Sequence, residues 1–102
     1  MHPIIKSHTA ELADLCRRFH VRRLDLFGSA TGDKFDPRHS DVDLLVEFVP
    51  GGTLNALDQY FGLKEALETL LDRRVDLVEA SAVKNPYIWK SIEETRESLY
   101  AA

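Results

Sequence analysis

The sequence predicts an α/β protein (α+β in a finer scheme), with a small mixed β-sheet flanked by helices. Segments with the hydrophobic periodicity of helices alternate with short apolar strands, in the order α-β-β-α-β-α. A chain of 102 residues has room for one core, so we expect residues 1–102 to form a single domain. Hydrophobic residues make up 44% of the chain and glycines and prolines are few, which excludes a disordered or fibrous protein.

The first predicted element is an amphipathic helix over residues 9–19. Its apolar side chains recur at positions i, i+3, i+4 and i+7, and charged residues occupy the other side. Ser7 or Thr9 is the expected N-cap, because a hydroxyl oxygen there can accept a hydrogen bond from a free helix N–H. Cys16, the only cysteine, falls on the apolar side, and we interpret it as a buried small hydrophobic residue.

Two strands are expected next. Residues 21–27 alternate as a strand and end at a Gly-Ser pair, after which residues 31–40 are polar and rich in turn formers. Residues 41–49 have the strongest strand pattern in the chain, and a Pro-Gly-Gly sequence closes this strand.

The second half predicts a helix over residues 55–71, a strand over 75–79 and a last helix that begins at Asn85-Pro86, where Asn caps the helix and Pro takes its first position. The apolar stripe of the first of these helices is expected to hold Leu57, Tyr60, Phe61, Leu67, Leu70 and Leu71. The inward side of the last helix is expected to hold Ile88, Trp89, Ile92 and Leu99.

The net charge and the hydropathy of the sequence limit the kinds of molecule that this protein is expected to bind. The net charge is -4 and the pI is near 5.5, whereas a protein that grips nucleic acid non-specifically carries a basic excess, so we expect no direct nucleic-acid binding. No apolar stretch is long enough for a transmembrane helix and no signal-peptide pattern is present. We therefore expect a soluble cytoplasmic domain without a membrane partner.

Three aspartates occupy unusual places. Asp41 and Asp43 open the most apolar strand, and residues at i and i+2 project from the same face. Two carboxylates held side by side repel each other unless they share a cation, and oxygen ligands suit Mg²⁺ or Mn²⁺. Asp76 lies in the next predicted strand, and if the two strands are neighbours it completes a three-carboxylate site able to hold two metal ions at a phosphoryl centre.

A structural interpretation of the same acids stays open. In it, Asp41 caps the strand entrance, Asp43 pairs with Arg38 or Lys34, and Asp76 pairs with Arg74. For one isolated aspartate we would favour this interpretation, but for three together we favour the metal site, because clustered charges tend to be functional.

The Gly28-Ser29 pair adds a phosphate-binding feature. Glycine lets the backbone approach a ligand closely, and a serine hydroxyl can donate a hydrogen bond to a phosphate oxygen. Alone, such a pair most often marks a turn, and its significance comes from its place shortly before Asp41 and Asp43.

Taken together, Gly28-Ser29, a polar loop, the sequence Asp-Val-Asp-Leu-Leu-Val at residues 41–46 and Asp76 resemble the signature of the DNA polymerase β-type nucleotidyltransferase superfamily. More closely, most of the chain resembles the minimal nucleotidyltransferases (MNT), small antitoxins that act with HEPN-domain toxins. The resemblance implies the minimal nucleotidyltransferase core as the fold.

The resemblance also implies roles for the residues. Gly28 and Ser29 would hold the β- and γ-phosphates of a nucleoside triphosphate. Asp41, Asp43 and Asp76 would be the catalytic and metal-binding residues, holding Mg²⁺, with two ions expected. The implied reaction transfers AMP from ATP to a hydroxyl, that of a tyrosine, on a partner HEPN toxin, and this chain would be the antitoxin.

One position departs from the family pattern, which often has an arginine soon after Gly-Ser. Here the residues after Gly-Ser are Ala30, Thr31, Gly32 and Asp33, and the first basic residue is Lys34. Lys34 or Arg38, or the partner, would therefore supply that phosphate contact. We therefore keep a second hypothesis, a non-catalytic antitoxin that neutralises its toxin by direct complex formation. A phosphohydrolase with Asp41 as nucleophile is disfavoured. The small size leaves little material for an acceptor pocket, so we expect a hetero-oligomer.

Overall fold

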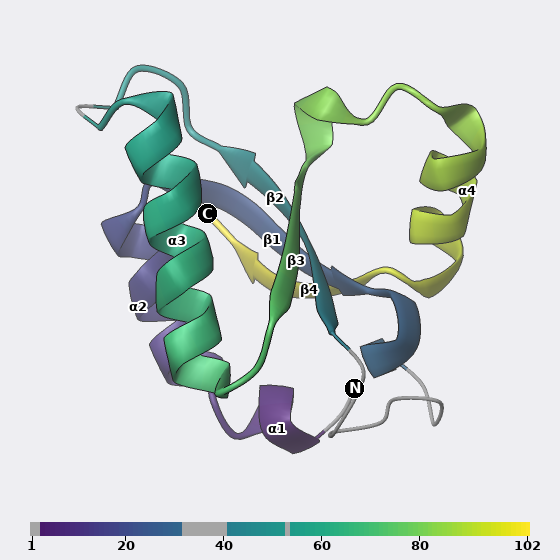
Figure 1. Cartoon of the computed structure of the whole chain (residues 1–102), viewed down its shortest axis with the longest axis horizontal. Helices are drawn as coiled ribbons and strands as arrows, with labels where there is room; N and C mark the ends of the chain where they lie inside the picture. Colours follow the sequence, from purple (N-terminus) through teal and green to yellow (C-terminus); the bar gives the residue numbers. More distant parts are fainter. Residues whose placement is uncertain (1–2, 32–40, 53) are drawn as a thin grey trace.

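A computed structural model of the protein describes residues 3–31, 41–52 and 54–102. Its centre is a mixed four-stranded sheet with the strand order β3-β2-β1-β4. The central strand β1 runs antiparallel to both of its neighbours, whereas β2 and β3 are parallel (Figure 1). The strands are β1 (Val21–Phe27), β2 (Val42–Phe48), β3 (Val75–Glu79) and β4 (Glu97–Ala101).

Two helices, α2 (Thr9–Arg18) and α3 (Ala56–Leu71), cover one face of the sheet (Figure 1). Leucine, isoleucine and valine side chains from these helices and from the covered face of the strands form the core, and Cys16 is buried among them as predicted. The two helices pack against the sheet because this contact buries their apolar stripes and so removes apolar surface from water. The core includes Ile5, Leu12, Leu24, Leu26, Leu44, Val46, Leu63, Leu67 and Leu71.

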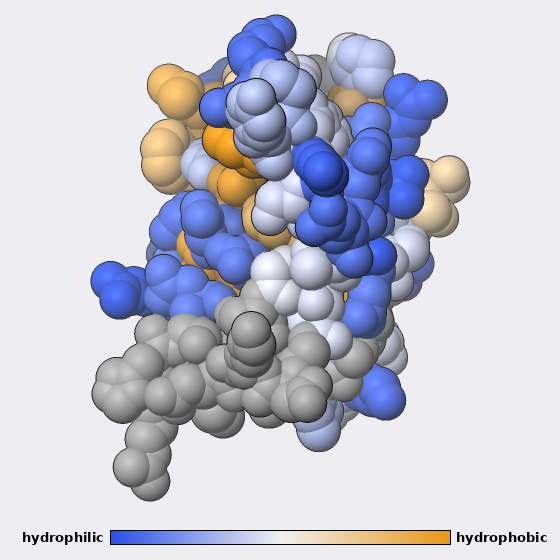
Figure 2. Space-filling view, turned by 90° about the vertical axis from the view of Figure 1, so that its right-hand side faces the viewer, coloured by the Kyte–Doolittle hydropathy of each residue, from blue (hydrophilic) through white to orange (hydrophobic). Residues whose placement is uncertain are grey.

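The helix α4 (Pro86–Thr95) lies away from α2 and α3, on the other side of the sheet (Figure 1). The Asn85 side chain accepts a hydrogen bond from the Tyr87 N–H and Pro86 begins the helix, as the sequence predicted. Ile92 is its buried residue. The side of the molecule that bears α4 mixes hydrophilic and hydrophobic residues (Figure 2), and Tyr87 there is 81% exposed.

The prediction for the end of the chain was wrong. Leu99 does not continue the last helix, because α4 ends at Thr95 and Arg96 is extended, with a ψ of 128°. Leu99 lies in β4, whose backbone pairs with the free edge of β1. Pairing with β4 gives hydrogen-bond partners to backbone N–H and C=O groups of β1, which would lack them if the last helix continued through Leu99. This tertiary contact overrides the helical pattern of the local sequence. Ile88, also predicted to face inward, is 50% exposed.

Two smaller expectations also need correction. A short helix α1 (Pro3–Lys6) precedes α2, so the hydroxyl of Ser7 donates to the Ile4 carbonyl, and the N-cap of α2 is His8, whose side chain makes no capping bond. In α3, Leu57 and Phe61 are 70% and 58% exposed, since the buried stripe of that helix follows Leu63, Leu67 and Leu71 instead.

None of the helices in residues 3–31, 41–52 and 54–102 is both long enough and apolar enough to cross a membrane.

Candidate functional site

The three predicted aspartates lie at the same end of the β2–β3 pair. Asp43 in β2 and Asp76 in β3 are direct partners in the parallel register, and Asp41 immediately precedes β2. The neighbours Val42 and Leu44 are fully buried on the side of α2 and α3, so alternation places Asp43 on the opposite face. Adjacent strands lie about 4.8 Å apart, and the structure therefore brings Asp43 and Asp76 together as the sequence predicted.

The electrostatics of this cluster centre on Asp43. Its side chain is half-buried, and burial together with the negative charges of Asp76 and Asp41 raises its pKa to about 6. Asp41 is more exposed and has an ion-pair partner, with Arg74 Nε 3.5 Å from its Oδ1. The structural interpretation had assigned Arg74 to Asp76, so this pairing is different. Within the described residues, no ion pair compensates Asp43 or Asp76.

The chemistry of the three carboxylates of Asp41, Asp43 and Asp76 suits a divalent metal ion. A half-buried carboxylate whose pKa is raised by two neighbouring carboxylates is stabilised by a cation that the three share, and Mg²⁺ prefers carboxylate oxygens. As the side chains stand, no three His, Cys, Asp or Glu groups of the described residues converge closely enough to hold a metal ion. The assignment of the metal to Asp41, Asp43 and Asp76 therefore rests on register and charge.

Gly28 is adapted to the Asp43 carboxylate. It follows β1 with a φ of +76°, and Phe27 is the register partner of Asp43, so a side chain at position 28 would collide with that carboxylate. The Gly28 N–H donates to Thr95 Oγ1 at 3.0 Å. Gly28 thus makes room for Asp43 through its missing side chain, while its N–H is already engaged.

Of the other predicted phosphate-binding residues, only Ser29 lies in the part of the chain that the structure describes. Ser29 follows Gly28 in the short 3₁₀ helix η1 (Gly28–Thr31). Lys34 and Arg38 lie outside the described residues. The nucleotide-binding roles of Ser29, Lys34 and Arg38 stay predictions.

The sequence analysis missed a buried charged cluster beside the site. Asp25 in β1 is fully buried, Arg23 Nε lies 3.0 Å from its Oδ2, and Arg96, which follows α4, donates to the same carboxylate. The register partner of Asp25 is Leu45, two residues beyond Asp43 on the same face. An aspartate inside an apolar strand was the signal that identified Asp41 and Asp43, and the same signal applied to Asp25.

Tyr60 in α3 is a second missed neighbour, because the sequence analysis treated it as a core residue. Its hydroxyl donates to the carbonyl oxygen of Leu77, the residue after Asp76. Burial and the nearby charge of Asp76 raise the pKa of Tyr60, so its hydroxyl stays protonated and keeps this hydrogen bond.

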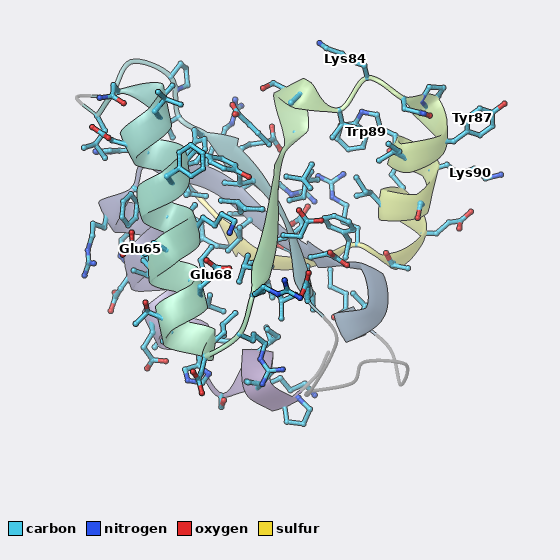
Figure 3. All side chains as sticks on the ribbon, in the orientation of Figure 1. Glu65, Glu68, Lys84, Tyr87, Trp89 and Lys90 are labelled. Carbon is cyan, nitrogen blue, oxygen red and sulfur yellow. The ribbon has the colours of Figure 1, made fainter. Side chains whose placement is uncertain are left out.

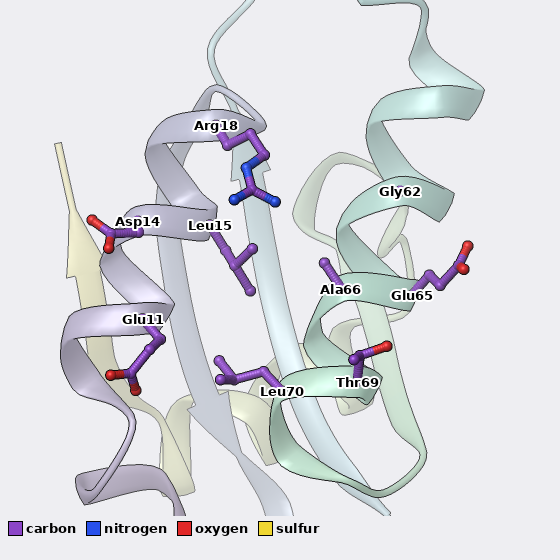
Figure 4. Close-up of a pocket in the computed structure, with 9 residues that line it drawn as sticks. All are labelled: Glu11, Asp14, Leu15, Arg18, Gly62, Glu65, Ala66, Thr69 and Leu70. Carbon is purple, nitrogen blue, oxygen red and sulfur yellow. The ribbon is translucent and has the colours of Figure 1, made fainter.

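Two of the cavities in the described part of the chain lie beside the sheet. One of about 510 Å³ lies between α2 and α3 (Figure 4), on the helix-covered side of the sheet, and contains no predicted site residue. The other, of about 370 Å³, lies near the ends of β2 and β3 and is lined by Glu47, Phe48, Glu79, Ala80, Ser81 and Trp89. The second cavity shares β2 and β3 with Asp43 and Asp76.

Comparison with known proteins gives relatives along most of the chain. The family described as nucleotidyltransferase domain matches residues 11–99. A Methanocaldococcus jannaschii protein, provisionally named a protein adenylyltransferase, is 37% identical over 92 residues, covering 89% of this chain and 86% of the relative. Protein adenylyltransferase MntA of Thermococcus cleftensis is 40% identical over 82 residues, covering 80% of this chain and 76% of that protein.

Solved structures agree with these relatives. One provisionally described as a minimal nucleotidyltransferase superposes with a TM-score of 0.75 and 30% identity, covering 95% of each chain. A complex of a tri-AMPylated Shewanella oneidensis HEPN toxin with MNT antitoxin has a TM-score of 0.66 at 20% identity, covering 96% of this chain and 73% of the matched chain, which is a likeness of fold. With the family match over residues 11–99, these relatives show that the chain belongs to the nucleotidyltransferase-domain family, among its minimal members.

Proposed function

We propose that this chain is a Mg²⁺-dependent protein adenylyltransferase that transfers AMP from ATP to a tyrosine hydroxyl of a HEPN-domain toxin and thereby acts as its antitoxin. The observation that carries the proposal is the direct pairing of Asp43 with Asp76 in a nucleotidyltransferase domain. ATP as donor implies a cytoplasmic reaction.

The relatives support the acceptor class. The Thermococcus cleftensis relative is named a protein adenylyltransferase, and a structure of the same fold contains an AMPylated HEPN toxin with MNT antitoxin. A toxin partner also fits the small size of this chain, because the acceptor hydroxyl then comes from a second protein and needs no pocket built from these 102 residues.

In the proposed reaction, the acceptor oxygen forms a bond to the α-phosphorus of ATP while the bond from that phosphorus to the β-phosphate oxygen breaks, and pyrophosphate leaves. Bound Mg²⁺ would neutralise phosphate charge and favour the ionised acceptor hydroxyl. Asp43 and Asp76 would hold the metal ions, with Asp41 as the third carboxylate. Gly28 leaves the space in which the Asp43 carboxylate is held.

One observation favours the second candidate, a non-catalytic antitoxin that neutralises its toxin by complex formation. The N–H of Gly28 is bound to Thr95 and is not free for a phosphate, and no arginine follows Ser29 closely in the sequence. In this alternative the aspartates would serve the structure alone.

The experiment that separates the two uses ATP labelled on the α-phosphate, Mg²⁺ and a HEPN-domain partner. We expect the wild type to label the partner and Asp43→Asn to lose at least 100-fold in rate while still binding the partner. Glu65→Gln, an exposed change on α3, is the control and should label normally. Changing the labelled tyrosine of the partner to phenylalanine tests the acceptor.

Two results would contradict the proposal. Equal labelling by wild type and Asp43→Asn would remove the carboxylate from the chemistry. Absence of label with the wild type, while a tight complex still blocks the toxin, would establish the binding function instead.

A further inference from the structure

The cavity of about 370 Å³ lies at the C-terminal ends of β2 and β3, next to the 3₁₀ helix η2 (Ala80–Ala82). Glu47 and Phe48 contribute from β2, and Trp89 contributes from α4 across the gap. The cavity therefore joins the sheet to α4 on the side where Asp43 faces.

Its position along the strands matches the length of a nucleotide. Asp43 and Glu47 are four residues apart on the same face of β2, with the buried Leu45 between them. Asp76 and Glu79 are three apart in β3 and therefore lie on opposite faces of that strand. At about 3.3 Å per residue, the cavity begins roughly 10–13 Å from the aspartates along the strands. That is the span of one ribose and base when the α-phosphate lies at Asp43 and Asp76.

The direction also agrees. Gly28 lies against the Asp43 carboxylate at the beginning of β2 and begins η1. The proposed function places the β- and γ-phosphates on this side. A nucleotide whose β- and γ-phosphates point toward η1 must direct its nucleoside the other way, toward the end of β2 and the cavity.

The Trp89 side chain can act as a stacking surface. It lies on the side of α4 that faces η2, whereas Tyr87 and Lys90 point outward (Figure 3). Its Nε1–H donates to the Val83 carbonyl at 3.0 Å, which holds the ring in one orientation. Aromatic rings held in this way stack on nucleobases irrespective of the base, so Trp89 would supply affinity.

Glu47 can supply selectivity. No hydrogen bond or ion pair joins its carboxylate to another of the described residues, whereas the Glu79 carboxylate already accepts a hydrogen bond from Ser81 Oγ at 3.2 Å. An ionised carboxylate only accepts hydrogen bonds. It therefore favours a base that presents an amino group, such as the N6 group of adenine, over one that presents a carbonyl.

We propose that this cavity binds the nucleobase of the nucleoside triphosphate, stacked on Trp89 and donating its exocyclic amino group to Glu47. The inference rests on the proposed nucleotidyltransferase function and assigns its base selectivity: adenine is preferred to hypoxanthine, which has a carbonyl oxygen in place of the amino group.

Trp89 permits a direct binding test, because it is the only tryptophan in the sequence. With Mg²⁺ present, we expect ATP to change the tryptophan fluorescence of the wild-type protein in a saturable way, while tripolyphosphate leaves it unchanged. Equal changes with both ligands, or none with ATP at concentrations that saturate transfer, would overturn the inference.

Selectivity gives the second test. We expect wild-type kcat/KM for ATP to exceed that for inosine triphosphate about tenfold, equivalent to one hydrogen-bond difference of about 1.4 kcal/mol. Glu47→Gln should bring the ratio toward one, because its amide can donate to the hypoxanthine carbonyl. Glu94→Gln, an exposed change on α4, should keep the wild-type ratio.

The two proposals fail in different ways. Transfer by the wild type with an unchanged ratio in Glu47→Gln would overturn the base pocket and leave the transferase intact. A fluorescence change specific to ATP without any transfer would support the pocket and contradict the proposed catalysis.

Discussion

At the scale of single residues, Asp43 is held in a state that costs stability. Burial and the charges of Asp76 and Asp41 raise its pKa from 3.8 to about 6, so the native state binds this proton more tightly than the unfolded chain does. Stability from Asp43 is therefore highest below pH 4, falls as the pH rises from about 4 to about 6, and stays low above that range.

We predict that Asp43→Asn stabilises the metal-free protein at neutral pH, since asparagine carries no charge to bury. In EDTA, the free energies of unfolding of variant and wild type should converge near pH 4 and differ by roughly 2–3 kcal/mol at pH 7, in favour of the variant. Urea unfolding at a series of pH values measures this difference. Parallel pH profiles would contradict it. A variant more stable but inactive is the pattern expected of a functional carboxylate.

At the scale of elements, α3 holds the edge strand that carries Asp76. The Val75 N–H donates to Glu68 Oε2 at 3.0 Å, and the Tyr60 hydroxyl donates to the Leu77 carbonyl. Glu68 lies on the side of α3 toward β3, whereas Glu65 lies on the outer side (Figure 3). Both backbone groups belong to the outer edge of β3, so α3 satisfies polar groups that an edge strand would otherwise present to another chain.

We predict that Tyr60→Phe lowers the free energy of unfolding by about 1 kcal/mol, because the Leu77 carbonyl loses its donor beside the core. Tyr87→Phe is the matched control: Tyr87 is 81% exposed, and its loss of a hydroxyl should change nothing measurable. Urea unfolding of both variants decides the matter, and equal stability of the two would refute a role for Tyr60 at the β3 edge.

At the scale of the whole molecule, the chain returns to the sheet after α4, where β4 pairs with β1. The helix α4 is thereby held on the side of the sheet that bears the aspartates. Arg96 donates to the fully buried Asp25, and Thr95 accepts from the Gly28 N–H. These two contacts join residues about seventy positions apart in sequence, and they fix the end of α4 next to the start of η1. The cavity beside Trp89 depends on that placement, since α4 forms one of its sides.

We predict that Arg96→Ala destabilises the protein by about 3 kcal/mol, because it leaves the buried Asp25 carboxylate with Arg23 alone. Arg22→Ala, an exposed change in the same strand as Asp25, should cost well under 1 kcal/mol. Chemical unfolding compares the two. If Arg96→Ala lowers the free energy of unfolding no more than Arg22→Ala does, Arg23 alone suffices as the partner of Asp25.

The local pattern predicted most of the elements. The expected strands at 21–27 and 75–79 match β1 and β3, and the helix at 55–71 matches α3 to within one residue. These elements depend on periodicity and capping, which act over a few residues and are readable directly. The last segment failed because Leu99 suits a helix stripe and a strand equally well, and pairing with β1 decided the outcome.

The sequence by itself determined that Asp41 and Asp43 project together from the start of an apolar strand, since that follows from the two-residue period of any strand. It also carried the family resemblance. Only the tertiary structure decided that β3 runs parallel beside β2 with Asp76 opposite Asp43, that Arg96 reaches Asp25, and that Trp89 and Glu47 line the same cavity. Each of these joins residues far apart in the chain, and such contacts depend on packing between elements rather than on any local pattern.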